Sequence, residues 1–436
     1  MADLTSENLQ ALQANLHGVK WLIINEKSMI GLKQLYWVNL RLQQIFPTPE
    51  SESAPPFGGL NVILTGDFYQ LPPVAQRPLY YNKKLDFIEE IYGHSLYKKF
   101  DITIELNVIR RQDDTDVDAI KFKEALDHLR EDELQLADWK LLCTRVKAVV
   151  PHVVESFKNA LRIYSKKAEV HDFNHSRLRD IGNPVICIIA THQGLNAEKA
   201  SSDEAGNLHA ELDLSIGCRI MLLENIWTDY GLVNGAFGTV LDVVWEAGTT
   251  NPRQTPLLLL LVHFDSYDGP DCCLVDNKTA VPIFQSRRDF STSNITCSRT
   301  QFPIIVAYAM TVHKAQGITV DQAVLNITNR DFALGLTYVA LSRVKKLSGV
   351  LFEEGFDYER FVRKKPHPTM VMRKEDAQRR LEQHIDYVPL PDALVARSSA
   401  QIFQASLPIR TSSPQRASSL VPHASSQTPP VDDEIA

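Results

Sequence analysis

The sequence predicts an α/β fold built on parallel strands, with a small β module inserted within it. Two short apolar runs, residues 19–24 and 60–64, each end in polar residues and are separated by a helix-like segment. Apolar strands that alternate with amphipathic helices are typical of parallel sheets covered by helices. From about residue 182 to 302 the chain changes to short β-rich runs divided by Gly, Asn, Asp and Pro, and strand–helix alternation then returns. We therefore expect a small barrel-like module within an α/β chain.

The composition is that of a globular protein without a global basic field. Of 436 residues, 44% are hydrophobic and 23% are charged, and the formal net charge is −7. Contact with nucleic acid would therefore depend on local basic patches. The six cysteines include no C-x-x-C pair, which argues against a zinc site and for a reducing compartment. The amino terminus is a polar helix without the apolar core of a secretion signal, and we expect an intracellular soluble protein with no membrane span.

The first half of the chain alternates strands and helices. The apolar run 19–24, interrupted only by Lys20, predicts a strand, and residues 60–64 predict a second buried strand. Between them residues 32–46 predict a helix that Pro47 ends, and its apolar residues recur at helical spacing: Leu32, Leu35, Val38, Leu42 and Ile45. Residues 118–146 look helical, with four core candidates: Ala125, Leu129, Leu134 and Leu142.

The second half repeats the alternation around the β module. A strand at "LRIYSKK" precedes a helix at "AEVHDFNHSRL", and after the module the strand "PIIVAYAM" precedes the helix "LTYVALSRV". Beyond about residue 389 the chain is rich in Ser, Pro, Ala and Gln and poor in aromatic residues. Such a segment cannot bury enough apolar surface to fold, so we expect a disordered tail there.

The first chemical constellation is the polar pair Asn25 and Glu26 at the end of the first strand. Two carboxylates at such a strand end can bind magnesium through water and orient an attacking water molecule. Here the first residue of the pair is an amide. The plainer alternative, a strand that simply meets a polar loop, stays open from these residues alone.

The second constellation is "TGDFYQLPPV", residues 65–74, which follows the second strand. It places Asp67 and Gln70 at the carboxyl edge of the sheet, where ligands bind in open α/β folds. A neutral amide at that edge can sense a terminal phosphate by hydrogen bonding without adding negative charge. A proline-terminated turn would explain the two prolines but not the polar pair between apolar stretches.

The third constellation is "AYAMTVHKAQGITVDQA", residues 307–323. The strand ends in Thr311, and a turn follows that contains His313, Lys314, Gln316 and Gly317. Hydroxyl, imidazole, ammonium and amide groups around a glycine suit the phosphates of a nucleotide or of nucleic acid. A single His or Lys in a loop would more often be ordinary surface.

The fourth constellation is an arginine on an apolar helix face. In "YVALSRVKKLSGV" the residues Ala340, Leu341 and Val344 predict a buried face, and Arg343 lies among them. A buried arginine is costly unless it pairs with an anion, and one that meets a transferring phosphate can raise the rate by about 10³–10⁵. An internal salt bridge is the alternative for Arg343, and Arg111 in "VIRRQDD" has the same two interpretations.

Taken in order, these strings resemble the conserved motifs of Pif-type helicases, superfamily one DNA helicases that move 5′ to 3′ and are related to bacterial RecD. "IINEKSM" resembles motif II and "GDFYQLPPV" motif III; "RQDD" resembles the arginine-bearing motif that follows, "YAMTVHKAQGITVD" motif V and "YVALSRVKKLSGV" motif VI. "LSIGCRIMLLENIWTDYGLVNGAFGTV" resembles the start of the SH3-like module of the family. The resemblance extends from about residue 10 to about 355.

The resemblance implies RecA-like P-loop NTPase lobes and the domain limits that follow. Residues 1–108 would be the remainder of a truncated lobe one. Lobe two would consist of residues 109–182 and 303–364, and the SH3-like module of residues 183–302. Residues 365–436 would form a C-terminal extension that is largely disordered from about residue 389. ATP with Mg²⁺ would be the cofactors, and single-stranded or forked DNA the partner. The chain would be monomeric and nuclear, with the mitochondrion as the alternative compartment.

The resemblance also implies roles for individual residues. Glu26 would activate water, Gln70 would sense the γ-phosphate, and Arg111 and Arg343 would stabilise the transferred charge. Asn25, Asp67, Gln316 and Gly317 would contact the nucleotide. Thr311, His313 and Lys314 would contact DNA, and Asn25 with Glu26 would hold Mg²⁺ weakly through water.

Two departures from the family pattern leave the activity of the chain open. The phosphate loop G-x-x-x-x-G-K-[ST] is absent, since no Gly-Lys dipeptide occurs in the 436 residues, and we expect the segment that carries it to be missing before Met1. Asn25 replaces the aspartate that organises magnesium. The chain is thus expected to be a helicase with impaired ATP hydrolysis, or alternatively an ATP-inactive DNA-binding or scaffolding remnant of a mobile-element helicase.

Overall fold

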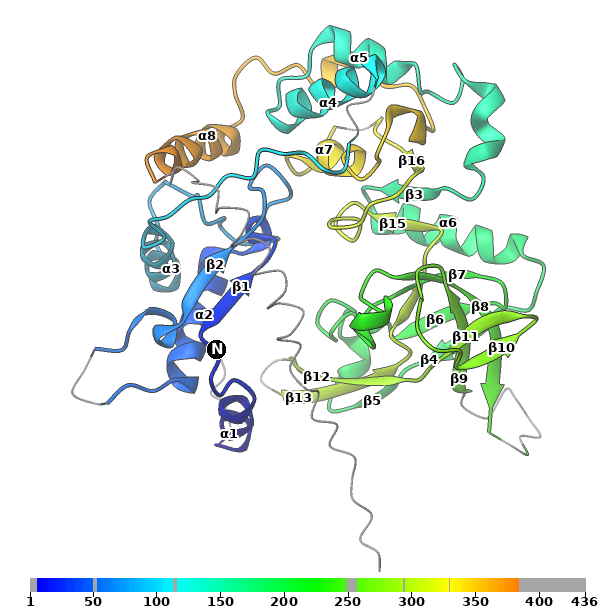
Figure 1. Cartoon of the computed structure of the whole chain (residues 1–436), viewed down its shortest axis with the longest axis horizontal. Helices are drawn as coiled ribbons and strands as arrows, with labels where there is room; N and C mark the ends of the chain where they lie inside the picture. Colours follow the sequence, from blue (N-terminus) through cyan, green and yellow to red (C-terminus); the bar gives the residue numbers. More distant parts are fainter. Residues whose placement is uncertain are drawn as a thin grey trace, which may run out of the picture. The chain divides into compact units, whose positions relative to one another are not determined.

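The computed structural model describes residues 6–49, 53–112, 116–246, 248, 257–292, 295–328 and 330–383 (Figure 1). All of them belong to one compact unit, residues 1–384. The tail expected to be disordered from about residue 389 lies outside the described residues. Within the described ranges, no helix combines the length and the apolar character needed to cross a membrane.

The amino-terminal α/β part contains two parallel strands, which Figure 1 shows side by side. Their register pairs Ile23 with Ile63. The elements of this part are α1 (Ser6–Asn15), β1 (Trp21–Ile24), α2 (Leu32–Ile45), β2 (Asn61–Leu64) and α3 (Ile88–Lys98). The strand, helix and strand predicted between residues 19 and 64 are therefore confirmed, with bounds that differ by at most two residues.

Helix α2 buries its predicted apolar face against one side of the strand pair. Leu32, Leu35 and Leu42 are buried in one cluster with the partly buried Val38 and with Leu22 of β1, and Ile45 is also buried. Each buried leucine or isoleucine contributes about 1.5–3 kcal/mol to folding. Helix α2 therefore covers the face of the strand pair that is opposite the Ile23 side chain.

The opposite face of the strand pair differs from the prediction. The strands were expected to be buried, but exposure alternates along them, and Trp21 and Ile23 are 60% and 63% exposed. Successive strand side chains point to opposite faces, so only the face toward α2 is covered by described residues. An apolar strand predicts burial but does not identify what covers each face.

The second α/β part has a four-stranded sheet in the order β15-β3-β16-β17, and all of its neighbouring strands are parallel. The strands are β3 (Leu161–Tyr164), β15 (Ala309–Thr311), β16 (Ala323–Leu325) and β17 (Val350–Phe352). The helices are α4 (Val117–Arg130), α5 (Leu136–Cys143), α6 (Lys167–Asp180) and α7 (Leu336–Leu341). A parallel sheet fed by helices confirms the predicted RecA-like α/β class.

The single helix expected over residues 118–146 is instead two helices. Asp132, between α4 and α5, has a φ of 60°, which falls in the left-handed region and cannot continue a right-handed helix. Asp116 starts α4 by accepting a hydrogen bond from the Ala119 N–H at 2.7 Å. The four predicted core residues of this region are nevertheless all buried.

The β module contains antiparallel sheets in the middle of the second α/β part. Its main sheet has the order β10-β11-β9-β8-β7-β14, and two smaller sheets have the orders β12-β13-β5 and β4-β6. The strands are β4 (Ile186–Ile189), β5 (Thr191–Gln193), β6 (Glu211–Leu214), β7 (Arg219–Leu222), β8 (Phe237–Trp245), β9 (Leu257–Phe264), β10 (Cys273–Val275), β11 (Lys278–Ile283), β12 (Ser286–Thr292), β13 (Ile295–Gln301) and β14 (Ile304–Val306). The strand predicted at 303–310 is thus divided: β14 pairs with β7, and β15 joins the parallel sheet.

Helix α8 (Pro368–Leu381) follows the second α/β part and was not predicted. Its Met372 is buried in the same core cluster as Leu32 and Leu35 of α2. Short 3₁₀ turns complete the fold: η1 (Lys27–Met29), η2 (Pro56–Gly59), η3 (Pro151–Phe157), η4 (Ala197–Lys199), η5 (Thr228–Tyr230), η6 (Leu347–Gly349) and η7 (Tyr358–Arg360). Residues 365–383 therefore contain a helix that packs on the amino-terminal part.

Candidate nucleotide and nucleic-acid site

The ends of β1 and β2 are held together by backbone hydrogen bonds. The Lys27 N–H donates to the Thr65 carbonyl at 2.8 Å, and Glu26 has a φ of 57° in the left-handed region. Gly66, with a φ of 125°, approaches so closely that a Cβ there would lie 2.9 Å from the Lys27 nitrogen. Glycine permits this approach, and the polar residues that follow both strands therefore meet at one edge.

Both residues of the predicted polar pair have hydrogen-bond partners. The Thr65 hydroxyl donates to the Asn25 side-chain oxygen at 2.7 Å, and the Gln316 amide donates to the Glu26 carboxylate at 2.9 Å. The second contact joins residues that are 290 positions apart in the sequence. It brings the third constellation onto the first, as the predicted site requires.

Asn25 and Glu26 are the two residues predicted to hold magnesium through water. Together they supply one carboxylate, and no described group of three or more His, Cys, Asp or Glu could hold a metal ion. Mg²⁺ prefers several oxygen ligands in octahedral geometry and keeps part of its water shell. The predicted contact through water remains a prediction, and no chemical step is assigned to the ion.

Arg111 and Arg343 lie close to one another without an acidic partner among the residues that the structure describes. Arg111 donates to the Thr319 hydroxyl at 2.8 Å and to the Ser342 carbonyl at 2.9 Å. Arg343, only 2% exposed, donates to the Val339 carbonyl at 2.9 Å and to the Ser342 hydroxyl at 2.8 Å. The salt-bridge alternative for these arginines finds no support in the described part of the chain.

The pKa values of both arginines are lowered, which agrees with their burial and their closeness to one another. Burial, followed by the charge of Arg111, lowers the pKa of Arg343 to about 10, while Tyr338 and Glu26 act to raise it. Burial also lowers the pKa of Arg111, against the charges of Tyr338 and Glu26. Two adjacent guanidinium groups that carry no bonded carboxylate favour a bound anion, because the anion offsets both their burial and their mutual repulsion.

Gln70 and Asp67 turn toward different partners. The Gln70 side-chain oxygen is buried without a hydrogen-bond partner in the described structure. Asp67 instead accepts two hydrogen bonds from Arg130 of α4, at 3.1 and 3.2 Å, and lies 3.5 Å from the Tyr338 hydroxyl. The structure therefore places Asp67 in an ion pair within the protein, while Gln70 keeps an acceptor available.

These residues fit the terminal phosphate of a nucleotide but not a whole triphosphate. Arg111 and Arg343 supply cationic donors, and the buried oxygens of Gln70 and Gln316 lack partners in the described structure. An amide oxygen of this kind can accept a hydrogen bond from a water molecule and so orient it. The 436 residues contain no Gly-Lys dipeptide to hold the other phosphates.

The predicted DNA-contacting residues gather at the carboxyl end of β15. The Lys314 N–H donates to the Thr311 hydroxyl at 3.4 Å, and the His313 ring stacks on Phe332 with centroids 6.4 Å apart. Phe332 is 67% exposed, so its ring can also stack on a nucleic-acid base. Burial and then the charge of Lys167 lower the pKa of His313. Gly317, also in this turn, has a φ of 86° and open space around it.

A second histidine lies beside this basic turn. Burial, followed by the charges of Lys314 and Arg299, lowers the pKa of His209 to about 4. Its Nε2 atom is buried without a partner in the described structure. Lys167 is paired with Asp203 at 2.8 Å, so the surface combines positive charge with one acidic residue.

Several residues that shape the site were not predicted from the sequence. The Gln112 amide donates to the Val344 carbonyl at 3.1 Å and anchors the segment that carries Arg111. Arg130 and Tyr338 surround Asp67, and Phe332 stacks on His313. Gln112 directly follows Arg111 in the "RQ" string and could have been selected for that reason. The others carry no local signal, because their roles depend on contacts between distant segments.

Comparisons with known proteins identify relatives of the chain. Residues 5–138 match the PIF1-like helicase family, and residues 203–243 match the DNA helicase Pif1 2B domain. The ATP-dependent DNA helicase PIF1 of Xenopus laevis is 28% identical over 332 residues, which cover 75% of this chain and 46% of that protein. The chain spans about half the length of the first curated relatives it matches.

Solved structures share the fold. The crystal structure of the Pif1 helicase from Candida albicans aligns with a TM-score of 0.62 at 21% identity and covers 86% of this chain and 82% of that one. The Pif1 helicase from Bacteroides in complex with ADP-AlF3 and single-stranded DNA aligns with a TM-score of 0.57 at 23% identity, over 87% and 79% of the two chains.

Proposed function

We propose that the chain is a member of the PIF1-like helicase family, whose models match residues 5–138 and 203–243, and that the protein is an ATP-dependent DNA helicase of the Pif type. In this proposal the described residues form the part of the ATP site that acts on the terminal phosphate. They also form a surface for single-stranded DNA.

The observation that carries the proposal is the pair Arg111 and Arg343, both desolvated and both without a bonded carboxylate in the described structure. Glu26 lies near enough to act on the pKa of each. Glu26 would accept the proton of the attacking water as the water oxygen bonds to the terminal phosphorus and ADP leaves. The two arginines would stabilise the charge that develops, and Gln70 would orient the water.

The hydrogen bond between Gln316 and Glu26 supports coupling between DNA and nucleotide. Gln316 lies on the turn that also contains His313 and Lys314. A strand bound at those two residues would shift the turn and with it the Glu26 carboxylate. We propose single-stranded or forked DNA as the substrate, and a monomer as the acting form, with the nucleus as its compartment and the mitochondrion as the alternative.

We expect these 436 residues to hydrolyse ATP only at background rate. The phosphate loop has no counterpart in them, and Asn25 brings no charge to balance a divalent ion. The same two facts favour the second candidate function, an ATP-inactive protein that binds single-stranded DNA. The two candidates differ in whether the terminal phosphate changes DNA affinity.

The test measures the affinity for a fluorescent oligo-dT by anisotropy, with millimolar ADP or with the non-hydrolysable ATP analogue AMP-PNP. For the helicase we expect AMP-PNP to change the affinity several-fold relative to ADP, and Arg111→Met and Arg343→Met to abolish the difference. Arg110→Met is the matched control, because Arg110 adjoins Arg111 but is exposed. If wild type does not distinguish the nucleotides, the ATP-inactive function replaces the helicase.

A salt titration tests the DNA surface independently of the nucleotide. Each phosphate contact by Lys or Arg releases counterions, so the affinity should fall as salt rises. Equal affinity at low and high salt would refute the proposed DNA surface. Lys314→Met should reduce the slope, while Lys140→Met on α5 should leave it unchanged.

A further inference from the structure

Arg373 of α8 is buried against the loop that carries Gln70. It is 1% exposed, and its three donor groups bond to the Gln70 carbonyl at 2.9 Å, the Tyr69 carbonyl at 3.3 Å and the Tyr80 hydroxyl at 3.1 Å. None of these partners is a carboxylate. A guanidinium group desolvated in order to bind backbone carbonyls fixes the position of that backbone more than it adds to stability.

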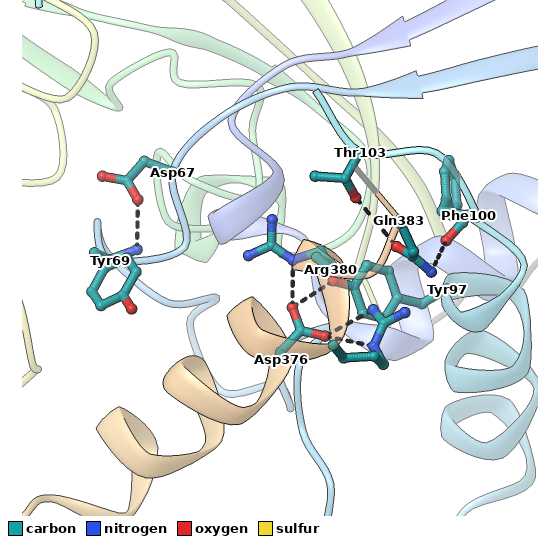
Figure 2. A network of polar contacts seen from close by, with 9 residues as sticks. Asp67, Tyr69, Tyr97, Phe100, Thr103, Asp376, Arg380 and Gln383 are labelled. Atoms are coloured by element: carbon teal, nitrogen blue, oxygen red, sulfur yellow. Dashed lines mark hydrogen bonds and ion pairs between the residues drawn. The ribbon is translucent and has the colours of Figure 1, made fainter. Parts of the chain in front are cut away.

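Helix α8 is itself held firmly on the amino-terminal part. Figure 2 shows Asp376 of α8 between Arg380 and the Tyr97 hydroxyl, which donates to it at 2.8 Å. Arg379 donates to the same carboxylate at 2.9 Å. Beyond the helix, the Gln383 carbonyl accepts from the Thr103 N–H at 3.1 Å. The arginine contacts lie within α8, whereas the Tyr97 and Thr103 contacts join α8 to the amino-terminal part and place it so that Arg373 meets the loop in one geometry.

The loop has few other constraints on its backbone at Gln70. Within it, the Tyr69 N–H donates to the Asp67 side chain at 3.0 Å and the Gln70 N–H donates to the Asp67 carbonyl at 3.1 Å. The two prolines that follow lack an N–H and cannot add such bonds. The Gln70 side-chain oxygen has no partner in the described structure, so the direction of this amide depends on its backbone.

We propose that Arg373 is a positioning residue for the phosphate-sensing loop: from α8 it fixes the carbonyls of Tyr69 and Gln70 and thereby aims the Gln70 amide. The inference rests on the proposed nucleotide site, because the orientation of the Gln70 amide matters only where that amide contacts a phosphate or the attacking water. It gives α8, which follows the helicase-like motifs in the sequence, a part in nucleotide sensing.

The experiment uses the full chain and the variants Arg373→Met and Arg379→Met. Both substitutions remove an arginine from α8, but Arg379 contacts Asp376 and not the loop, so it is the matched control. Two quantities are measured: the ratio of oligo-dT affinities with AMP-PNP and with ADP, and the hydrogen exchange rate of the amides at Tyr69, Gln70 and Leu71. Melting temperatures show whether each variant is folded.

We expect Arg373→Met to bring the AMP-PNP to ADP ratio close to one and to raise loop exchange by about tenfold, which corresponds to about 1.4 kcal/mol. Arg379→Met should change neither quantity. Arg373→Lys keeps the cation, but its single ammonium nitrogen cannot reproduce the planar fork that spans the three acceptors, so it should give an intermediate ratio. It also replaces the methionine variant if that one does not fold.

The outcomes separate the inference from the proposed function. If wild type distinguishes the nucleotides and Arg373→Met does so equally well, the inference is wrong and the function stands. If wild type does not distinguish them, the proposed function fails. Loop exchange then decides the inference alone: unchanged exchange in Arg373→Met overturns it, and the tenfold rise supports Arg373 as the residue that fixes the loop.

Discussion

The ion pair between Asp67 and Arg130 should contribute measurably to stability, because it joins the Gln70 loop to α4. Its two hydrogen bonds are 3.1 and 3.2 Å long, and the side chains are 24% and 32% exposed. Although burial opposes it, Asp67 raises the pKa of Arg130 above its ordinary value. Two unit charges about 4 Å apart attract by about 4 kcal/mol at an effective dielectric constant of about 20. Desolvation and side-chain ordering oppose this, and we expect a coupling free energy of about 2 kcal/mol.

A double-mutant cycle measures this coupling from urea unfolding of wild type, Asp67→Asn, Arg130→Met and the double variant. Arg130 also lies over the Tyr69 ring at 4.0 Å, but that contact is lost in both arginine variants and cancels in the cycle. The pair Lys158 and Glu155, 62% and 85% exposed, is the control and should show less than about 0.5 kcal/mol. A coupling for Asp67 and Arg130 as small as the control would refute the reasoning.

Three further predictions follow from single positions. Gly335→Ala should destabilise the fold by about 2–3 kcal/mol, whereas the control Gly182→Ala should cost about 1 kcal/mol. Both glycines have a positive φ, but only at Gly335 would a Cβ lie 2.9 Å from the Tyr69 carbonyl. Equal midpoints of urea unfolding for the two variants would contradict this. His209 has a folded pKa of about 4 and an unfolded value of 6.5, so the unfolded state binds the proton first and stability should fall as pH drops from 6.5 to 4. Unfolding at pH 7 and pH 5 should show a smaller loss for His209→Gln than for wild type, and equal losses would exclude the histidine as the cause. Asn25→Asp should gain a rise in melting temperature with millimolar Mg²⁺ while ATP hydrolysis stays at background, and robust turnover would show that the missing phosphate loop is not limiting.

Local patterns predicted the parts of the fold that depend on short sequence distances. Helix α2 and its neighbouring strands follow from apolar periodicity, which specifies the element and the face that is buried. Arg343 is buried as predicted, but α7 ends at Leu341, so Arg343 lies in the turn that follows the helix and not on a helix face. The prediction of burial is wrong for one face of β1, where the apolar residue Trp21 is exposed.

Partners that depend on distant segments could not be predicted from the sequence. Asp67 and Arg130 are 63 residues apart, and Arg373 is 303 residues from Gln70. A charged residue on a helix surface has many possible partners, and only the packing of the helices selects one. The sequence therefore identified Asp67 as polar and well placed but not as the member of an ion pair.

The contacts to residues 67–70 explain why this loop can report on the rest of the chain. It is contacted by Arg130 of α4, by Gly335 at the start of α7 and by Arg373 of α8, all of which come later in the sequence. Arg373 bonds the loop backbone, Gly335 approaches it closely, and Arg130 bonds the Asp67 side chain. The loop is therefore coupled to three packed elements, which rearrange between discrete states. A shift of α8 would either carry the Tyr69 and Gln70 carbonyls with it or break their bonds to Arg373, and we expect either result to change the direction of the Gln70 amide.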